Sequence, residues 1–164
     1  MTMNPPTEPD GRLTAFGNQL IEVHLWLREE LARLREDVYA HPERPRELRA
    51  HCLTFCSAVT KHHSGEDEGA FPALAEQFPE LRPVLDELAR DHRQVADIMR
   101  ELQELLGDLE ADPERVRADL DGLAALLESH FVYEERRLIS ALNALDAPGW
   151  RAAAPAFLSR GQMG

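Results

Sequence analysis

The chain has 164 residues, 30 of them acidic and 18 basic, which gives a formal net charge of −12. This length suits a single domain with its own core, and the negative charge repels phosphate backbones and anionic lipid headgroups, so we expect no nucleic acid partner. Since no segment approaches the roughly 20 apolar residues of a membrane-spanning helix, and residues 1–11 lack the features of a signal peptide, we expect a cytoplasmic protein without a membrane partner.

Four long stretches rich in Leu, Ala, Glu and Arg are separated by clusters of glycine and proline. Apolar residues recur in these stretches at alternating spacings of three and four, which is typical of the inward face of helices in a bundle. The pattern predicts helices over residues 12–38, 45–71, 81–107 and 113–146. Because the connections are short, the predicted fold is all-α, an antiparallel up-down-up-down four-helix bundle.

Local signals refine the fourth helix. Asp112, Pro113 and Glu114 combine an N-cap, a first-turn proline and an early acid, so the helix is predicted to begin there. After Glu134 the apolar spacing slips, which indicates a local change in winding near that residue.

The bundle is expected to occupy residues 12–147. Residues 1–11 are predicted to be a flexible N-terminus, and residues 148–164 a C-terminal tail. In the tail, Trp150, Phe157 and Leu158 are the apolar residues that could cap one end of the bundle.

Six ionisable residues stand at positions where the pattern calls for apolar ones. They are His24, His62, Glu66, His92, His130 and Glu134. Burying unpaired polar groups costs on the order of a few kcal/mol each, so six of them need a common partner. Counted along the predicted helices at ~1.5 Å per residue, the four histidines fall at about one level near the middle of the bundle.

The second and fourth helices share the pattern His62-x-x-x-Glu66 and His130-x-x-x-Glu134. This spacing puts a histidine and a carboxylate on one helix face, so both can reach the same centre. Four imidazoles and two carboxylates suit iron or manganese better than structural zinc. They are too many for one ion with an open position, so the sequence predicts two metal ions bridged by the glutamates, with room for a small ligand.

The second helix contains an alternative ligand pair. His63-x-x-x-Asp67 has the same spacing as His62-x-x-x-Glu66. The heptad puts His62 on the inward seam and His63 on its flank, so His62 is the predicted ligand and His63 the alternative. Tyr133, close to His130 in the sequence, is either a hydrogen-bond donor behind the ligands or a packing residue.

The spaced ligands resemble those of the hemerythrin-like HHE cation-binding family, in particular its bacterial members. The resemblance covers about residues 12–146 and rests on the following residues: His24, His62-x-x-x-Glu66, His92 and His130-x-x-x-Glu134. It implies a four-helix bundle that holds two iron ions with an oxo or hydroxo bridge. It also implies chemistry with O₂, peroxide or NO.

The chain departs from the oxygen-carrying hemerythrins of this family at two points. Those proteins supply a fifth histidine through a His-x-x-x-His pair in the third helix, whereas Leu88 and Ala96 flank His92 here. Their last motif ends in aspartate five residues after the histidine, where this chain has Glu134 followed by Glu135. Both departures argue against reversible oxygen carriage.

Together these features predict a non-haem di-iron protein with O₂- or peroxide-related redox activity, either oxidase-like or peroxidase- and catalase-like. Manganese is the alternative metal. The alternative function is a non-catalytic module that binds iron or senses O₂, NO or redox state, because identical ligands serve both roles. A purely structural metal bundle is a third and weaker reading. We expect a monomer or a weak homodimer.

Overall fold

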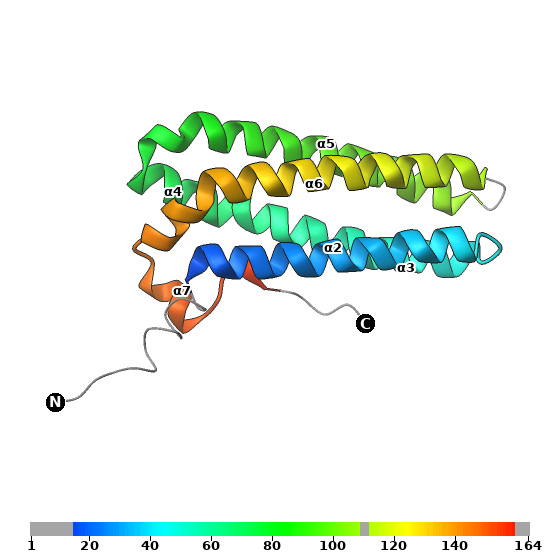
Figure 1. The fold of residues 1–164 in the computed structure, drawn as a ribbon, viewed down its shortest axis with the longest axis horizontal. Helices are drawn as coiled ribbons and strands as arrows, with labels where there is room; N and C mark the ends of the chain where they lie inside the picture. Colours follow the sequence, from blue (N-terminus) through cyan, green and yellow to red (C-terminus); the bar gives the residue numbers. More distant parts are fainter. Residues whose placement is uncertain (1–14, 109–111, 160–164) are drawn as a thin grey trace.

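The computed structural model describes residues 15–108 and 112–159, and long helices packed side by side make up most of it (Figure 1). The four main helices are α2 (Phe16–Ala40), α3 (Pro45–Gly65), α5 (Arg82–Gly107) and α6 (Pro113–Ala144). They run alternately in opposite directions. α2 and α5 each pack against both α3 and α6. The predicted all-α bundle is confirmed, whereas the predicted flexible segment 1–11 lies outside the described residues.

The second long helix changes its winding directly after the histidine pair. α3 ends at Gly65, a π-helical turn η1 covers Glu66–Ala70, and α4 follows over Phe71–Gln77. In the π turn the Phe71 N–H donates to the Glu66 carbonyl oxygen, five residues earlier. This wider turn places residues five apart on one face, so Glu66 and Phe71 are both buried. A short 3₁₀ turn, η2 (Pro79–Leu81), leads into α5.

The predicted change in winding after Glu134 in the fourth helix is wrong, because α6 is α-helical from Pro113 to Ala144. Leu138 and Leu142 follow Glu134 at spacings of four, and both are 1% exposed. A run of fours drifts only slowly around a helix of 3.6 residues per turn, so these residues stay inside without any irregularity. The predicted start of the helix is confirmed, since the Asp112 side chain accepts from the Glu114 N–H at 3.0 Å.

Two apolar clusters fill the bundle, and the polar residues lie between them. The first includes Leu27, Leu34, Phe55, Leu102 and Leu120. The second includes Leu20, Leu74, Leu88, Leu138 and Phe157. Each fully buried side chain of this kind contributes about 1.5–3 kcal/mol. The apolar clusters on both sides therefore hold the helices in place around the polar level.

The chain after α6 folds back over the end of the bundle where α2 begins (Figure 1). It forms α7 (Pro148–Ala152) and a 3₁₀ turn, η3 (Ala156–Leu158), and η3 packs against α2 and α3. Phe157 and Leu158 are buried, and the Trp150 ring lies edge-on to Phe16 at 5.1 Å and to Phe157 at 5.4 Å. The tail caps the bundle through the three apolar residues that the sequence singled out.

Gly17 marks a close approach between α2 and α6. Its N–H donates to the Asn143 side chain at 2.8 Å. A Cβ at this position would lie 2.7 Å from Asn143 Oδ1 and 2.9 Å from the Ile139 backbone oxygen. The backbone oxygen cannot rotate away, so a larger residue would force the two helices apart.

We therefore expect Gly17→Ala to lower the free energy of unfolding by about 1–3 kcal/mol, the usual cost of overpacking. Chemical denaturation followed by circular dichroism measures it. Gly122→Ala in α6 is the matched control, because nothing lies within 4 Å of its added Cβ, and it should raise stability by about 0.5–1 kcal/mol. Equal stability of the two variants would contradict the close approach.

Candidate metal centre

Seven ionisable side chains converge between the two apolar clusters. They are His24 from α2, His62 and His63 from α3, Glu66 from η1, His92 from α5, and His130 and Glu134 from α6. Each is at most 5% exposed. The structure thus brings together all six residues predicted from the seam, and it adds His63.

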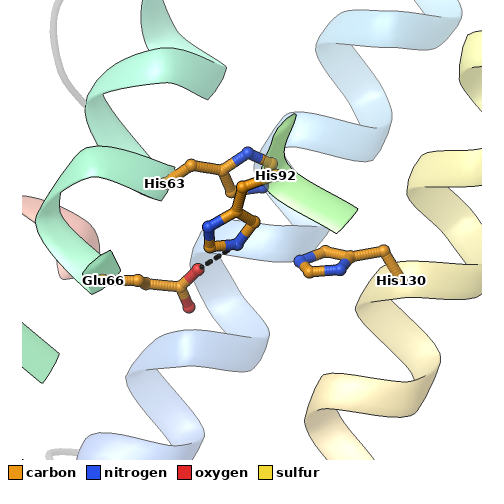
Figure 2. Close-up of side chains that lie close together, drawn as sticks. All are labelled: His63, Glu66, His92 and His130. Atoms are coloured by element: carbon orange, nitrogen blue, oxygen red, sulfur yellow. Dashed lines mark ion pairs between the residues drawn. The ribbon is translucent and has the colours of Figure 1, made fainter. Parts of the chain in front are cut away.

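The seven residues form two groups that share a carboxylate. One group is His63, Glu66, His92 and His130, and the other is His24, His62, Glu66 and Glu134. Within each group, one potential ligand atom from every residue lies within 4.8 Å of the others. Figure 2 shows the first group, with the side chains of His63, Glu66, His92 and His130 directed toward one another. The geometry offers two neighbouring positions for cations.

Each of the two glutamates reaches both groups. Glu66 Oε1 lies 3.1 Å from His92 Nε2, an ion pair drawn in Figure 2, and Glu66 Oε2 lies 3.6 Å from His62 Nε2. Glu134 Oε1 lies 2.9 Å from His24 Nε2, and its Oε2 lies 3.9 Å from His130 Nε2. Each carboxylate therefore turns one oxygen toward each group, which is the arrangement of a bridging ligand.

Four of the histidines are oriented from behind by a hydrogen bond. Their Nδ1–H groups donate as follows: His24 to Glu135 at 2.7 Å, His62 to the Phe157 carbonyl at 2.6 Å, His92 to Asp67 at 2.9 Å and His130 to Asp91 at 2.9 Å. A carbonyl or carboxylate oxygen can only accept, so Nδ1 carries the proton. The Nε2 lone pair then faces the centre, as in metal-ligating histidines.

Most of the inward-facing atoms have no hydrogen-bond partner among the described residues. Unpartnered buried atoms among the described residues include Nε2 of His63, His92 and His130, Oε1 of Glu66 and both carboxylate oxygens of Glu134. In addition, Nε2 of His24 and Nε2 of His62 face one another at 3.3 Å. Unsatisfied buried groups cost about 1–3 kcal/mol each. A cation at each position would satisfy these atoms, so the residues present fit a metal site.

Burial keeps the imidazoles of α3 in the form that binds metal. It lowers the pKa of His62 to about 3, helped by the neighbouring charge of His24. Burial likewise puts the pKa of His63 well below its usual value. Both side chains are thus neutral at physiological pH, with lone pairs available.

The two carboxylates behave in opposite ways. Burial, followed by the charge of Glu134, raises the pKa of Glu66 well above its usual value. Burial also opposes ionisation of Glu134, but its contacts with His24 hold its pKa well below the usual range. Burial lowers the pKa of His24 as well, and the carboxylates of Glu134 and Glu135 outweigh it, so the net shift is upward. Two buried carboxylates sharing one centre favour the binding of positive charge between them.

The expectation that His63 lies on the flank of its helix is wrong. Its ring is 5% exposed, stacks on His92 at 3.8 Å and lies edge-on to His130 at 5.2 Å. Neighbouring residues on a helix differ by only about 100°, so both can reach a centre wide enough for several side chains. Assigning ligands by the heptad pattern allows one inward residue per turn, so it does not predict two neighbouring ligands. The signal in the sequence is the doublet itself, His62-His63.

The other two alternative residues lie farther from the centre. Asp67 faces solvent with 41% of its side chain exposed and accepts the hydrogen bond from His92. The Tyr133 hydroxyl donates to Glu87 at 2.7 Å, and its ring packs on the second apolar cluster. Tyr133 thus takes the packing role rather than donating to a candidate ligand.

Two hydrogen-bond acceptors could not be predicted from the sequence, because each accepts from a histidine on a helix other than its own. Asp91 precedes His92 in α5 but accepts from His130 in α6. Glu135 follows Glu134 in α6 but accepts from His24 in α2. An acid next to a ligand in the sequence is the available signal, although the sequence does not say which histidine it serves.

Comparison with known proteins agrees with this geometry. The family model described as the hemerythrin HHE cation binding domain matches residues 17–142, which include all seven clustered residues. Searches of curated proteins and of solved structures gave no significant match. Among the described residues, no helix combines the length and apolar character needed to cross a bilayer. By its matching family model and its buried histidine and glutamate clusters, which are suited to hold a metal ion, the chain belongs to the hemerythrin HHE cation-binding domain family.

Proposed function

We propose that the chain is a non-haem di-iron protein that carries out redox chemistry on O₂ or a peroxide. The observation that supports this most directly is the pair of ligand groups that share Glu66, with Glu134 reaching both. One iron would be held by His63, His92 and His130, and the other by His24 and His62. Both glutamates would bridge the two ions.

The donor set limits which metals fit the site. It consists of imidazole nitrogens and carboxylate oxygens without a thiolate, which suits iron or manganese rather than structural zinc. A pair of iron ions supplies the electrons for reactions with O₂ or peroxide. The histidines divide unequally, three against two, so the His24–His62 side has the more open coordination.

The protein's own part is to position and shield these groups. Apolar clusters lie on both sides of the centre along the bundle and hold its helices in place. The hydrogen bonds to Nδ1 hold four imidazoles with their lone pairs inward, which favours metal binding before any substrate arrives.

A cleft lined by residues of α3 and α5 leads toward the centre. Its volume is about 180 Å³, and His63 and His92 line it together with Arg93 and Ala96. Ala96 is one of the two positions where the oxygen-carrying hemerythrins of the resemblance could place the second histidine of their pair. Its small side chain leaves room for a molecule of the size of O₂ or peroxide.

Peroxide decomposition tests the proposed activity. Iron-loaded protein should consume hydrogen peroxide in the steady state. His62→Ala should lower this rate by at least about tenfold, because loss of a ligand weakens metal binding at the centre. Oxygen evolution and residual peroxide are the measurements. Negligible rates in both proteins, with two irons bound, would overturn the enzymatic proposal in favour of a binding or sensing module.

Metal content provides the second prediction. Protein from iron-replete cells should contain about two irons per chain. Glu66→Ala and Glu134→Ala should lose most of both, because each removes a group shared by the two ions, whereas His63→Ala should lose mainly one. Elemental analysis after gel filtration measures this. One tightly held zinc per chain, with no iron uptake, would contradict the di-iron centre.

The cleft gives the third prediction. Ala96→Leu should slow the binding of azide to the ferric protein several-fold, because the larger side chain fills the cleft beside His63 and His92. Stopped-flow absorbance measures the rate. Gln94→Leu introduces the same side chain at an exposed position of α5 outside the cleft lining, and should bind azide at the unmodified rate. Equal rates in the two variants would mean that ligands enter elsewhere.

A further inference from the structure

The C-terminal tail contacts the candidate metal centre directly. The Nδ1–H of His62 donates to the backbone carbonyl of Phe157 at 2.6 Å, across 95 residues of sequence. His62 is 2% exposed and Phe157 is 1% exposed, so the bond is shielded from water. A hydrogen bond of this kind sets both the tautomer and the orientation of a ligating ring.

This partner differs in kind from those of the other oriented histidines. His24, His92 and His130 donate to carboxylates carried by α6, η1 and α5. These acceptors are built into the bundle itself. His62 instead depends on an uncharged carbonyl from a segment that folds over the end of the bundle after α6 is complete.

Gly65 allows the tail to come this close. A Cβ at residue 65 would lie 2.7 Å from Phe157 N and 3.2 Å from Phe157 Cα. Both are backbone atoms, which cannot turn aside. The φ and ψ of Gly65, −61° and −37°, are ordinary α-helical values, so its backbone conformation does not require glycine. The missing side chain matters because it leaves room for the tail beside His62.

Aromatic packing holds the tail from the other side. Trp150 lies edge-on to Phe16 of α2 and to Phe157. Such pairs contribute about 0.5–1.5 kcal/mol each beyond the area they bury. The Phe157 ring thus packs on Trp150 on one side and lies near the His62 ring, at 6.4 Å between centroids, on the other.

We propose that residues 148–158, which we call the strap, act as a positioning element of the metal centre: the Phe157 carbonyl orients His62, and Gly65 admits the strap. The inference rests on the proposed metal centre. An uncharged carbonyl attracts the Nδ1 proton less strongly than a carboxylate does. The Nε2 atom of His62 is therefore a weaker electron donor to a metal than the Nε2 atoms of the other oriented histidines. The metal position of His24 and His62 is therefore the one that depends on a docked strap.

Iron release tests the proposal in the full-length, iron-loaded protein. We expect Gly65→Ala to release about half of its iron to an excess of a hexadentate chelator at least ~10-fold faster than the unmodified protein, the usual scale for losing a partner of a metal ligand. Gly69→Ala is the matched control, because it makes the same change in η1 with nothing within 4 Å of the added Cβ. It should release iron at the unmodified rate.

Two further variants separate positioning from general destabilisation. Phe157→Ala loosens the strap while keeping the carbonyl, and it should speed release without adding to the effect of Gly65→Ala, since both act by undocking the same segment. Leu145→Ala removes a buried side chain of the same apolar cluster and leaves every hydrogen bond to a candidate ligand in place. It should lower the melting temperature but not speed release. Equal acceleration by Leu145→Ala would overturn the positioning role.

The tautomer of His62 provides a readout that does not require iron. In full-length ¹⁵N-labelled protein before iron is added, long-range proton–nitrogen correlation spectra should show His62 protonated at Nδ1. Gly69→Ala should keep this tautomer, and Gly65→Ala should lose it. If no iron binds, the proposed function fails while this experiment still tests the strap. An unchanged His62 signal in Gly65→Ala would overturn the strap itself.

Discussion

The structure depends on one constraint, which is the burial of two carboxylates and five imidazoles inside a closely packed bundle. Such groups are stable there only if their lone pairs and charges are met. The opposite pKa shifts of Glu66 and Glu134 show this tension, because burial and the charge of Glu134 raise the pKa of Glu66, whereas the contacts with His24 lower the pKa of Glu134. The apolar clusters above and below hold the seven groups together and limit their contact with water. The lone pairs and negative charge of these groups must therefore be satisfied within the centre, by a cation.

The fold and most of the centre could be predicted because both follow from helical periodicity. An ionisable residue in a seam of leucines is conspicuous, and His24 and His92 were found in this way. The four predicted histidines also lie at one level because the connections are short and the helices antiparallel. His63 was misplaced because a seam is treated as a line, whereas the centre spans the width of a helix face. The π turn at Glu66 was missed since nothing in the residue types requires an extra residue in that turn.

The spacing of apolar residues could not predict contacts between segments that lie far apart in the sequence. The acceptors Asp91 and Glu135 orient histidines on other helices, and the Phe157 carbonyl belongs to the tail. A backbone carbonyl carries no sequence signal at all. The role of Gly65 could not be predicted from the sequence either. Glycine is needed there because the backbone of Phe157 lies close to it, and not because of its own backbone conformation.

The division of the five histidines, three in one group and two in the other, gives the centre two unlike sides. With Leu88 and Ala96 flanking His92 in α5, the fifth imidazole comes from His63 in α3, and the small Ala96 borders a cleft that reaches His63 and His92. On the opposite side the His24 ring stacks on Phe131 at 4.1 Å, and the Arg28 guanidinium lies over Phe131. The cleft thus opens beside the group with three histidines, whereas His24 and His62 lie against Phe131 and the strap respectively.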